Sequence, residues 1–160
     1  MKFLILILAI IINIQTGFSQ LKATKICPPV SVDVLAGKVN SLYPKSTSGE
    51  IQKDLPCFTE VIEADSAKCA GVFYADQGLY FYPGRNYFEV RENFKGKITL
   101  PLGTARSSLF SILGNPKIKD LTWDAYQTEY GTLVLYYNKD GKINKMQISS
   151  KSTDALKLCE

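Results

Sequence analysis

The chemistry most directly implied by this sequence is that of its four cysteines, Cys27, Cys57, Cys69 and Cys159. The chain has no histidine and no Cys-x-x-Cys spacing, so these residues do not form a recognisable zinc or dithiol redox motif. An even number of cysteines in an exported chain predicts two disulfides. Of the three possible pairings we favour Cys57–Cys69, which would close a local hairpin, and Cys27–Cys159, which would tie the two ends together.

Catalytic motifs are missing. Without histidine the chain lacks the usual general base and the commonest metal ligand. It also has no Gly-x-Ser-x-Gly, no glycine-rich phosphate loop and no His-Glu-x-x-His. Spaced acidic or amide side chains are interpreted as solvated charges or turn residues: Glu60 with Glu63, Asp120 with Asp124, and Asn138 with Asp140. We therefore predict that the protein is not an enzyme and needs no cofactor or metal.

Tyrosine is the residue type that favours a binding function, because it combines a rigid aromatic body with a polar tip. Strand alternation is expected to place Tyr80, Tyr82, Tyr87, Tyr136 and Lys145 on one outer sheet face. On this interpretation they form a docking surface. The alternative is structural: cross-strand tyrosine pairs stabilise sheets, and some of these rings would then be core.

Two aromatic hairpins are expected to carry these residues. The first spans 79–82 and turns at Pro83-Gly84, and the second spans 133–137 and turns at Asp140-Gly141. The side chains expected to face the core are Leu79, Phe81, Phe88, Val90, Leu133, Leu135, Tyr137, Met146 and Ile148.

Short helices are expected to cover this sheet. One spans 49–55 after Thr47 or Ser48, a second spans 104–113, and the ambiguous segment 30–43 is interpreted as helical rather than extended. The predicted fold class is therefore α+β, with short helices packed on one face of an antiparallel sheet.

The sequence also suggests an internal duplication. Gly37-Lys38-Val39 reappears as Gly96-Lys97-Ile98, and each is followed by a short helix, a proline and an aromatic hairpin. Such self-similarity predicts one supersecondary unit stacked on its twin. Residues 20–160 would then form a single domain of two similar units, about 37–94 and 96–150.

The first 19 residues are typical of a signal peptide, with Lys2, an apolar run over 3–14 and small residues at Gly17 and Ser19. The run of about 12 residues is shorter than the ~20 needed to span a bilayer, although an uncleaved anchor is the alternative. Cleavage would leave 18 basic and 15 acidic residues, scattered along the chain, and this excludes a nucleic-acid-binding stripe. We expect a periplasmic or secreted protein without stable membrane insertion.

The second half carries a family pattern. It comprises Leu102-Gly103-Thr104, Leu113-Gly114-Asn115-Pro116, Trp123 with Tyr126, and a strand over 133–137 followed by Asp140-Gly141-Lys142-Ile143. This pattern resembles the small outer-membrane-assembly lipoproteins and the secreted β-lactamase inhibitor proteins that share their fold. The resemblance covers 100–148 well and 37–90 loosely. It implies helices leading into a sheet whose open face or loops dock a protein, and it implies a core position for Trp123.

The predicted function is an exported, non-catalytic domain that binds another protein of the envelope or extracellular space. It could be an inhibitor, an immunity protein or an envelope accessory factor. The alternative is a glycan- or small-ligand-binding module that uses the same aromatic residues as stacking platforms.

Overall fold

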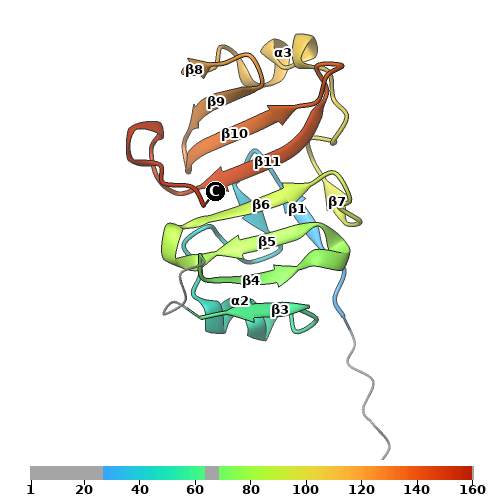
Figure 1. Ribbon diagram of the computed structural model, residues 1–160, viewed down its shortest axis with the longest axis vertical. Coiled ribbons are helices and arrows are strands. Elements are labelled where there is room, and N and C mark those ends of the chain that lie inside the picture. The colour runs from blue at the N-terminus through green and yellow to red at the C-terminus, as the bar shows by residue number, and fades with distance from the viewer. Residues whose placement is uncertain (1–26, 64–68, 160) are drawn as a thin grey trace, which may run out of the picture.

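An eight-stranded antiparallel sheet forms most of the computed structural model, which describes residues 27–63 and 69–159 (Figure 1). The predicted signal peptide therefore lies outside the described residues. In spatial order the strands are β3 (Glu60–Ile62), β4 (Gly71–Tyr74), β5 (Leu79–Tyr82), β6 (Tyr87–Arg91), β11 (Ile143–Ser149), β10 (Gly131–Tyr137), β9 (Trp123–Thr128) and β8 (Ile118–Lys119).

A second, three-stranded sheet packs against the core of the first. Its central strand β1 (Ser31–Asp33) pairs antiparallel with β2 (Lys38–Val39) and parallel with β7 (Lys97–Ile98). The helices are short: α2 (Ser48–Asp54), α3 (Phe110–Leu113) and the 3₁₀ turns η2 (Ala75–Gln77), η3 (Pro83–Arg85), η4 (Arg106–Ser108) and η5 (Thr153–Ala155).

The predicted α+β class is wrong, because the structure is mostly β and its two α-helices have only 7 and 4 residues. Only the expected helix over 49–55 forms, as α2, with Thr47 and Glu50 making a capping box. The segment 30–43 forms β1 and β2 instead. Its apolar residues fit the helical period of 3.6 residues and also the strand period of two, and its β-branched valines favour the strand.

The second expected helix is broken into η4 and α3. The Arg106 amide donates to the Gly141 carbonyl at 2.9 Å, and Ala105 forms a bridge with Lys142. The start of this segment is therefore bonded to the β10–β11 turn and cannot continue a regular helical ladder.

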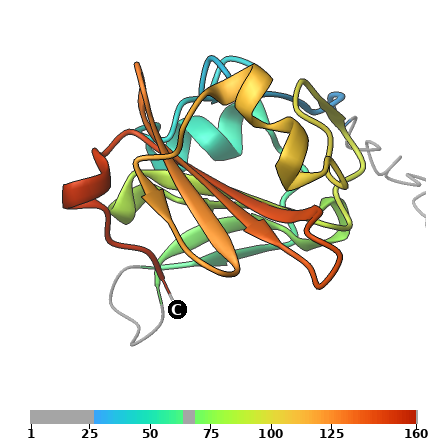
Figure 2. The same ribbon diagram turned by 90° about the horizontal axis from the view of Figure 1, so that it is seen from above.

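The alternation expected for the two hairpins is confirmed. All nine side chains expected to face the core are buried in one cluster. The layer over this inner face consists of the small sheet, α2, the η4–α3 segment and irregular segments (Figure 2). α2 adds Ile51 and Leu55 to the core, and the η4–α3 segment adds Leu109. The buried Tyr74 hydroxyl donates to the Leu55 carbonyl at 2.5 Å and so fixes the end of α2 on the sheet.

The large sheet consists of two four-stranded meanders, β3–β6 and β8–β11, whose last strands pair with each other. The two repeated Gly-Lys segments lie on either side of β1. A side chain at Gly37 would collide with the Tyr130 ring, and one at Gly96 would collide with the Val30 carbonyl. Two stacked copies of one unit would produce this arrangement, while the duplication itself stays a prediction.

Two disulfides are present, as predicted, but the pairing we favoured is wrong. Cys27 pairs with Cys57 and Cys69 pairs with Cys159, with Cα–Cα distances of 5.6 and 6.1 Å. Cys27 and Cys57 lie near Val30 and Tyr74 at the inner core, whereas Cys69 and Cys159 pack on the opposite face. The sheet therefore separates the two pairs.

The disulfides indicate an oxidising, exported location. Across 27–63 and 69–159, no helix is long and apolar enough to cross a membrane.

Replacing Cys69 and Cys159 together with serine should lower the free energy of unfolding by about 3–5 kcal/mol, because the long loop in the unfolded chain is released. Urea unfolding measures the loss, and a non-reducing peptide map should still show the Cys27–Cys57 bond. A map of the unaltered protein that contained a Cys57–Cys69 peptide would contradict the pairing.

Alkaline pH should unfold the protein through its buried phenols. Burial raises the pKa of Tyr74, Tyr87, Tyr130 and Tyr137 above the ordinary value of 10.0. The unfolded chain therefore loses these protons first, so stability is fully present below about pH 10 and falls as the pH rises further. The part of the absorbance change at 295 nm that comes from these four phenols should coincide with the loss of the far-UV circular dichroism signal. Ionisation of these tyrosines in a folded protein would contradict the prediction.

Candidate functional site

The five predicted site residues all lie on the outer face of the large sheet, the face turned away from the core cluster. The strand register pairs Tyr82 with Tyr87 and Tyr136 with Lys145, and it places Tyr80 opposite the outward-facing Glu89. The structure thus brings these residues to one face, but it divides that face into a covered part and an open part.

Tyr82 and Tyr87 belong to the covered part. Their side chains stack at 4.6 Å between ring centroids, and the residues are 8% and 1% exposed. Phe73, Leu158 and the Cys69–Cys159 disulfide pack around them. The structural alternative therefore applies to these two tyrosines, and we leave both out of the candidate site.

The cover is the C-terminal segment 150–159, here called the strap, which passes beside β9, β10 and β11 and ends near β6 (Figure 1). It is held by hydrogen bonds along its length. The Thr132 hydroxyl donates to the Lys151 carbonyl at 2.8 Å, and the Cys159 amide donates to the Tyr87 hydroxyl at 3.0 Å. An ion pair of 2.8 Å joins Lys117 to Asp154.

The open part is a row of side chains that we call the open stripe: Tyr80, Arg91, Lys145, Tyr136 and Trp123. Four of these residues lie directly opposite one another on adjacent strands, in the order Arg91, Lys145, Tyr136 and Trp123. All five are exposed or half-buried.

Two cation–π contacts order the open stripe. The Arg91 guanidinium lies 3.9 Å from the centroid of the Tyr80 ring, and the Lys145 ammonium lies 3.9 Å from that of Tyr136. Such contacts hold a cation over an aromatic face that remains partly accessible. The stripe therefore presents aromatic surface and positive charge together.

A chain of buried polar groups lies on the same outer face, beside the stripe. The Tyr136 hydroxyl donates to Gln147 Oε1 at 2.9 Å, and Gln147 Nε2 donates to Glu89 Oε2 at 2.8 Å. The other Glu89 oxygen forms an ion pair with Arg91. Burial, followed by the nearby Glu89 charge, raises the pKa of Tyr136, so its phenol keeps its proton and continues to donate.

Sequence reasoning missed two stripe residues. Trp123 was expected in the core, but it is partly exposed on the outer face. In β9 its side chain points to the same side of the sheet as Ala125, opposite to the inward-facing Asp124. Arg91 was not singled out, although it continues the alternation of Tyr87 and Glu89 by two residues. That alternation could have identified it.

An apolar cavity of about 240 Å³, the outer cavity, lies between the strap and the sheet beside the stripe. Trp123 and Tyr136 form one wall of it, next to Val134. Leu156 and Leu158 of the strap form the opposite wall.

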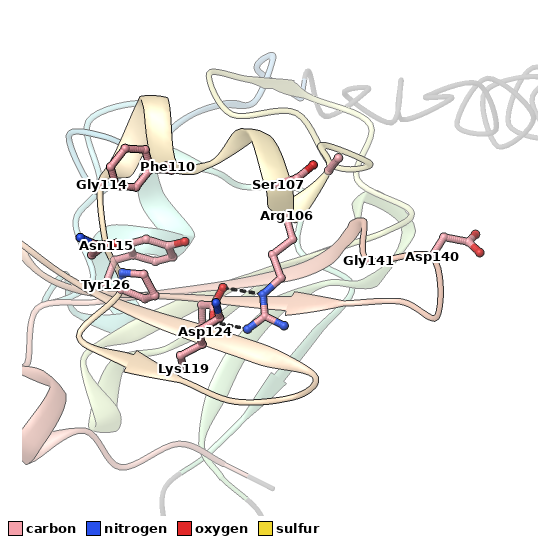
Figure 3. Close-up of a pocket in the computed structure, with 12 residues that line it drawn as sticks. Arg106, Ser107, Phe110, Gly114, Asn115, Lys119, Asp124, Tyr126, Asp140 and Gly141 are labelled. Carbon is pink, nitrogen blue, oxygen red and sulfur yellow. Dashed lines mark hydrogen bonds and ion pairs between the residues drawn. The ribbon is translucent and has the colours of Figure 1, made fainter.

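A larger cavity of about 550 Å³, the inner cavity, lies on the other face, near η4, α3 and the β10–β11 turn (Figure 3). Its central feature is a bidentate ion pair. Arg106 Nε and Nη2 donate to the two Asp124 oxygens at 2.9 and 2.5 Å. The Tyr137 hydroxyl donates to Asp124 Oδ2 at 2.8 Å.

This ion pair has a structural role, because it connects η4 to β9. Arg106 also donates to the backbone carbonyls of Asp120 and Leu121 at 2.6 and 3.1 Å, so it fastens η4 to the β8–β9 turn. The hydrogen bonds that Arg106 donates to Asp124 raise the pKa of Arg106 further above its ordinary value. Asp124 is buried and bound by Arg106 and Tyr137, whereas Asp120 is exposed.

Within the described part of the chain, no group of three or more histidine, cysteine, aspartate or glutamate residues could hold a metal ion. Comparisons with protein-family models, with curated proteins and with solved structures found no match.

Replacing Asp124 with alanine should destabilise the fold by about 3–5 kcal/mol, because the buried carboxylate is removed from both Arg106 and Tyr137. Urea unfolding measures the loss. Asp140→Ala, at the exposed edge of the same cavity, is the matched control and should stay within about 0.5 kcal/mol of the unaltered protein. Equal effects of the two substitutions would contradict the structural role of the ion pair.

Proposed function

We propose that the protein is an exported, non-catalytic domain that binds another protein through the open stripe. The observation that carries this proposal is the register of Arg91, Lys145, Tyr136 and Trp123, which lie opposite one another on four adjacent strands. With Tyr80 on the next strand, the stripe extends about 19 Å across the sheet at the usual spacing of strands. That width suits a broad protein interface.

The charges of the stripe indicate the chemistry of the partner. Arg91 and Lys145 are directly opposite each other, an arrangement that costs stability in an isolated sheet. Glu89 offsets Arg91, but no carboxylate in 27–63 or 69–159 forms an ion pair with Lys145. A partner surface with an acidic side chain beside apolar ones would complement this pattern.

The glycan or small-ligand alternative is less well supported by the same site. Trp123 and Tyr136 could stack on a sugar ring, but a ligand site also needs a few convergent polar groups. The outer cavity beside these rings is lined mainly by apolar side chains, and the Tyr136 hydroxyl is already bonded to Gln147.

The two disulfides support an exported role, and we extend this to a periplasmic or secreted protein of the inhibitor, immunity or envelope accessory type. The resemblance to the β-lactamase inhibitor proteins and the outer-membrane-assembly lipoproteins stays a prediction. It agrees with the proposal in one respect, because those families also dock proteins on a sheet face.

The test is affinity capture from native culture fluid or envelope extract with the purified protein and with its Tyr136→Ser and Lys145→Glu variants. A partner bound by the unaltered protein should be lost or weakened at least tenfold by Lys145→Glu, because like charges would then face each other. Lys95→Glu, on an exposed loop outside the stripe, should capture the partner normally.

A fold control separates binding from stability. Lys145→Glu should unfold within about 1 kcal/mol of the unaltered protein, since this side chain is partly exposed. Tyr136→Ser also removes the hydrogen bond to the buried Gln147, so it should lose about 1–3 kcal/mol and still fold at 25 °C. Tyr82→Ser should also lose stability, because its ring is packed beneath the strap. Undiminished capture by folded Tyr136→Ser and Lys145→Glu variants would show that the stripe is not the interface.

A further inference from the structure

The β8 edge of the large sheet has a free side with a cavity on each face. β8 is the last strand in the sheet order, and in the described part of the chain it pairs only with β9. Its two residues, Ile118 and Lys119, are both exposed. Ile118 lines the outer cavity on one face of the sheet, and Lys119 lines the inner cavity on the other (Figure 3).

This placement matches the geometry of an added strand. Successive side chains of a strand point to opposite faces, so a segment paired with β8 would send alternate side chains toward the two cavities. Backbone hydrogen bonds then supply affinity, and the pockets for alternate side chains supply specificity.

Exposed apolar side chains cluster around the same edge. Four of the six large hydrophobic residues that are exposed in the described structure lie within 110–121: Phe110, Ile112, Ile118 and Leu121. Phe110 is 67% exposed and borders the inner cavity, and Leu121 is 92% exposed in the turn after β8. Edges that only need to avoid aggregation carry charges and few apolar groups, so this clustering indicates a contact surface.

The two cavities call for different side chains. The lining of the outer cavity is mainly apolar and suits an aliphatic or aromatic group. In the inner cavity the Arg106 charge is offset by Asp124, and the Asp140 carboxylate points away from the cavity (Figure 3). Among the cations that line this cavity, Lys119 forms no ion pair within the described residues, and it suits an acidic group.

We propose that an extended segment of a partner protein pairs with β8 as a ninth strand. It places an apolar side chain in the outer cavity and an acidic side chain beside Lys119 in the inner cavity. The inference deepens the proposed function, on which it rests for the partner being a protein. The outer cavity borders Trp123 and Tyr136, so the added strand would be continuous with the open stripe.

The probe is a library of random linear nonapeptides displayed on phage and selected on the purified protein. Enriched peptides should alternate apolar and acidic residues. They should bind at least tenfold more weakly to the Lys119→Glu and Ile118→Asp variants, because one repels the acidic side chain and the other makes the outer cavity polar. Lys97→Glu, also an exposed lysine on an edge strand, is the matched control and should leave binding unchanged.

Backbone pairing has its own readout. A synthetic copy of an enriched peptide should shift the amide resonances of residues 117–120. Two further copies carry N-methyl groups on every second peptide nitrogen, one on the odd positions and one on the even positions. Only the copy whose methyl groups block the nitrogens that face β8 should lose binding. Failure of the library to enrich, equal binding by Lys119→Glu, or equal binding by both methylated peptides would each overturn strand addition.

The two proposals can fail separately. If peptide binding does not depend on β8 while partner capture still depends on Lys145, strand addition is wrong and the stripe stands. If Lys145→Glu still captures the partner but Lys119→Glu does not, the open stripe is not the interface and the β8 edge is.

Discussion

The pairing of β6 with β11 is the constraint on which the rest of the structure depends. Five residue pairs, from Lys145–Arg91 to Ser149–Tyr87, join two four-stranded meanders into one sheet. The junction also decides which side chains face the core, because a slip of one residue exchanges the two faces of a strand. In the observed register Phe88 and Met146 lie in the core. A slip of one residue would move charged Glu89 into the place of Phe88 or charged Lys145 into the place of Met146, so burial enforces the register that also aligns the open stripe.

The outer face is divided because its two ends have different chemistry. At one end Phe73, Tyr82 and Tyr87 form an apolar cluster that water would solvate poorly, and the strap with the Cys69–Cys159 disulfide covers it. At the other end the Tyr80 and Tyr136 rings each carry a cation, and the two cationic residues are exposed or half-buried. The strap therefore covers the apolar end of the outer face and leaves the charged end open. The open end is the open stripe, the candidate interface.

Local features of the fold could be predicted from sequence, and long-range ones could not. The Asp140-Gly141 turn, the capped helix after Thr47 and the in–out alternation of the hairpins depend on neighbouring residues, and the structure contains them. The fold class was wrong because strand and helix periods coincide in 30–43 and because bonds to the β10–β11 turn interrupt the helix expected over 104–113. The Cys69–Cys159 bond spans 90 residues and the Arg106–Asp124 pair depends on how η4 meets β9. No local pattern encodes either of them.

The buried Glu89 gives the stripe its stiffness. A buried carboxylate is costly unless it is paired, and an apolar residue at this position would fit a sheet face at lower cost. Glu89 instead holds Arg91 on one side and Gln147 on the other, and Gln147 in turn fixes the Tyr136 hydroxyl. This series of hydrogen-bonded side chains crosses from β6 to β11 and on to β10, so both meanders contribute to the orientation of the stripe residues. Side chains that are already ordered lose less entropy on binding, and this is the physical reason to connect a costly buried charge with recognition of a partner.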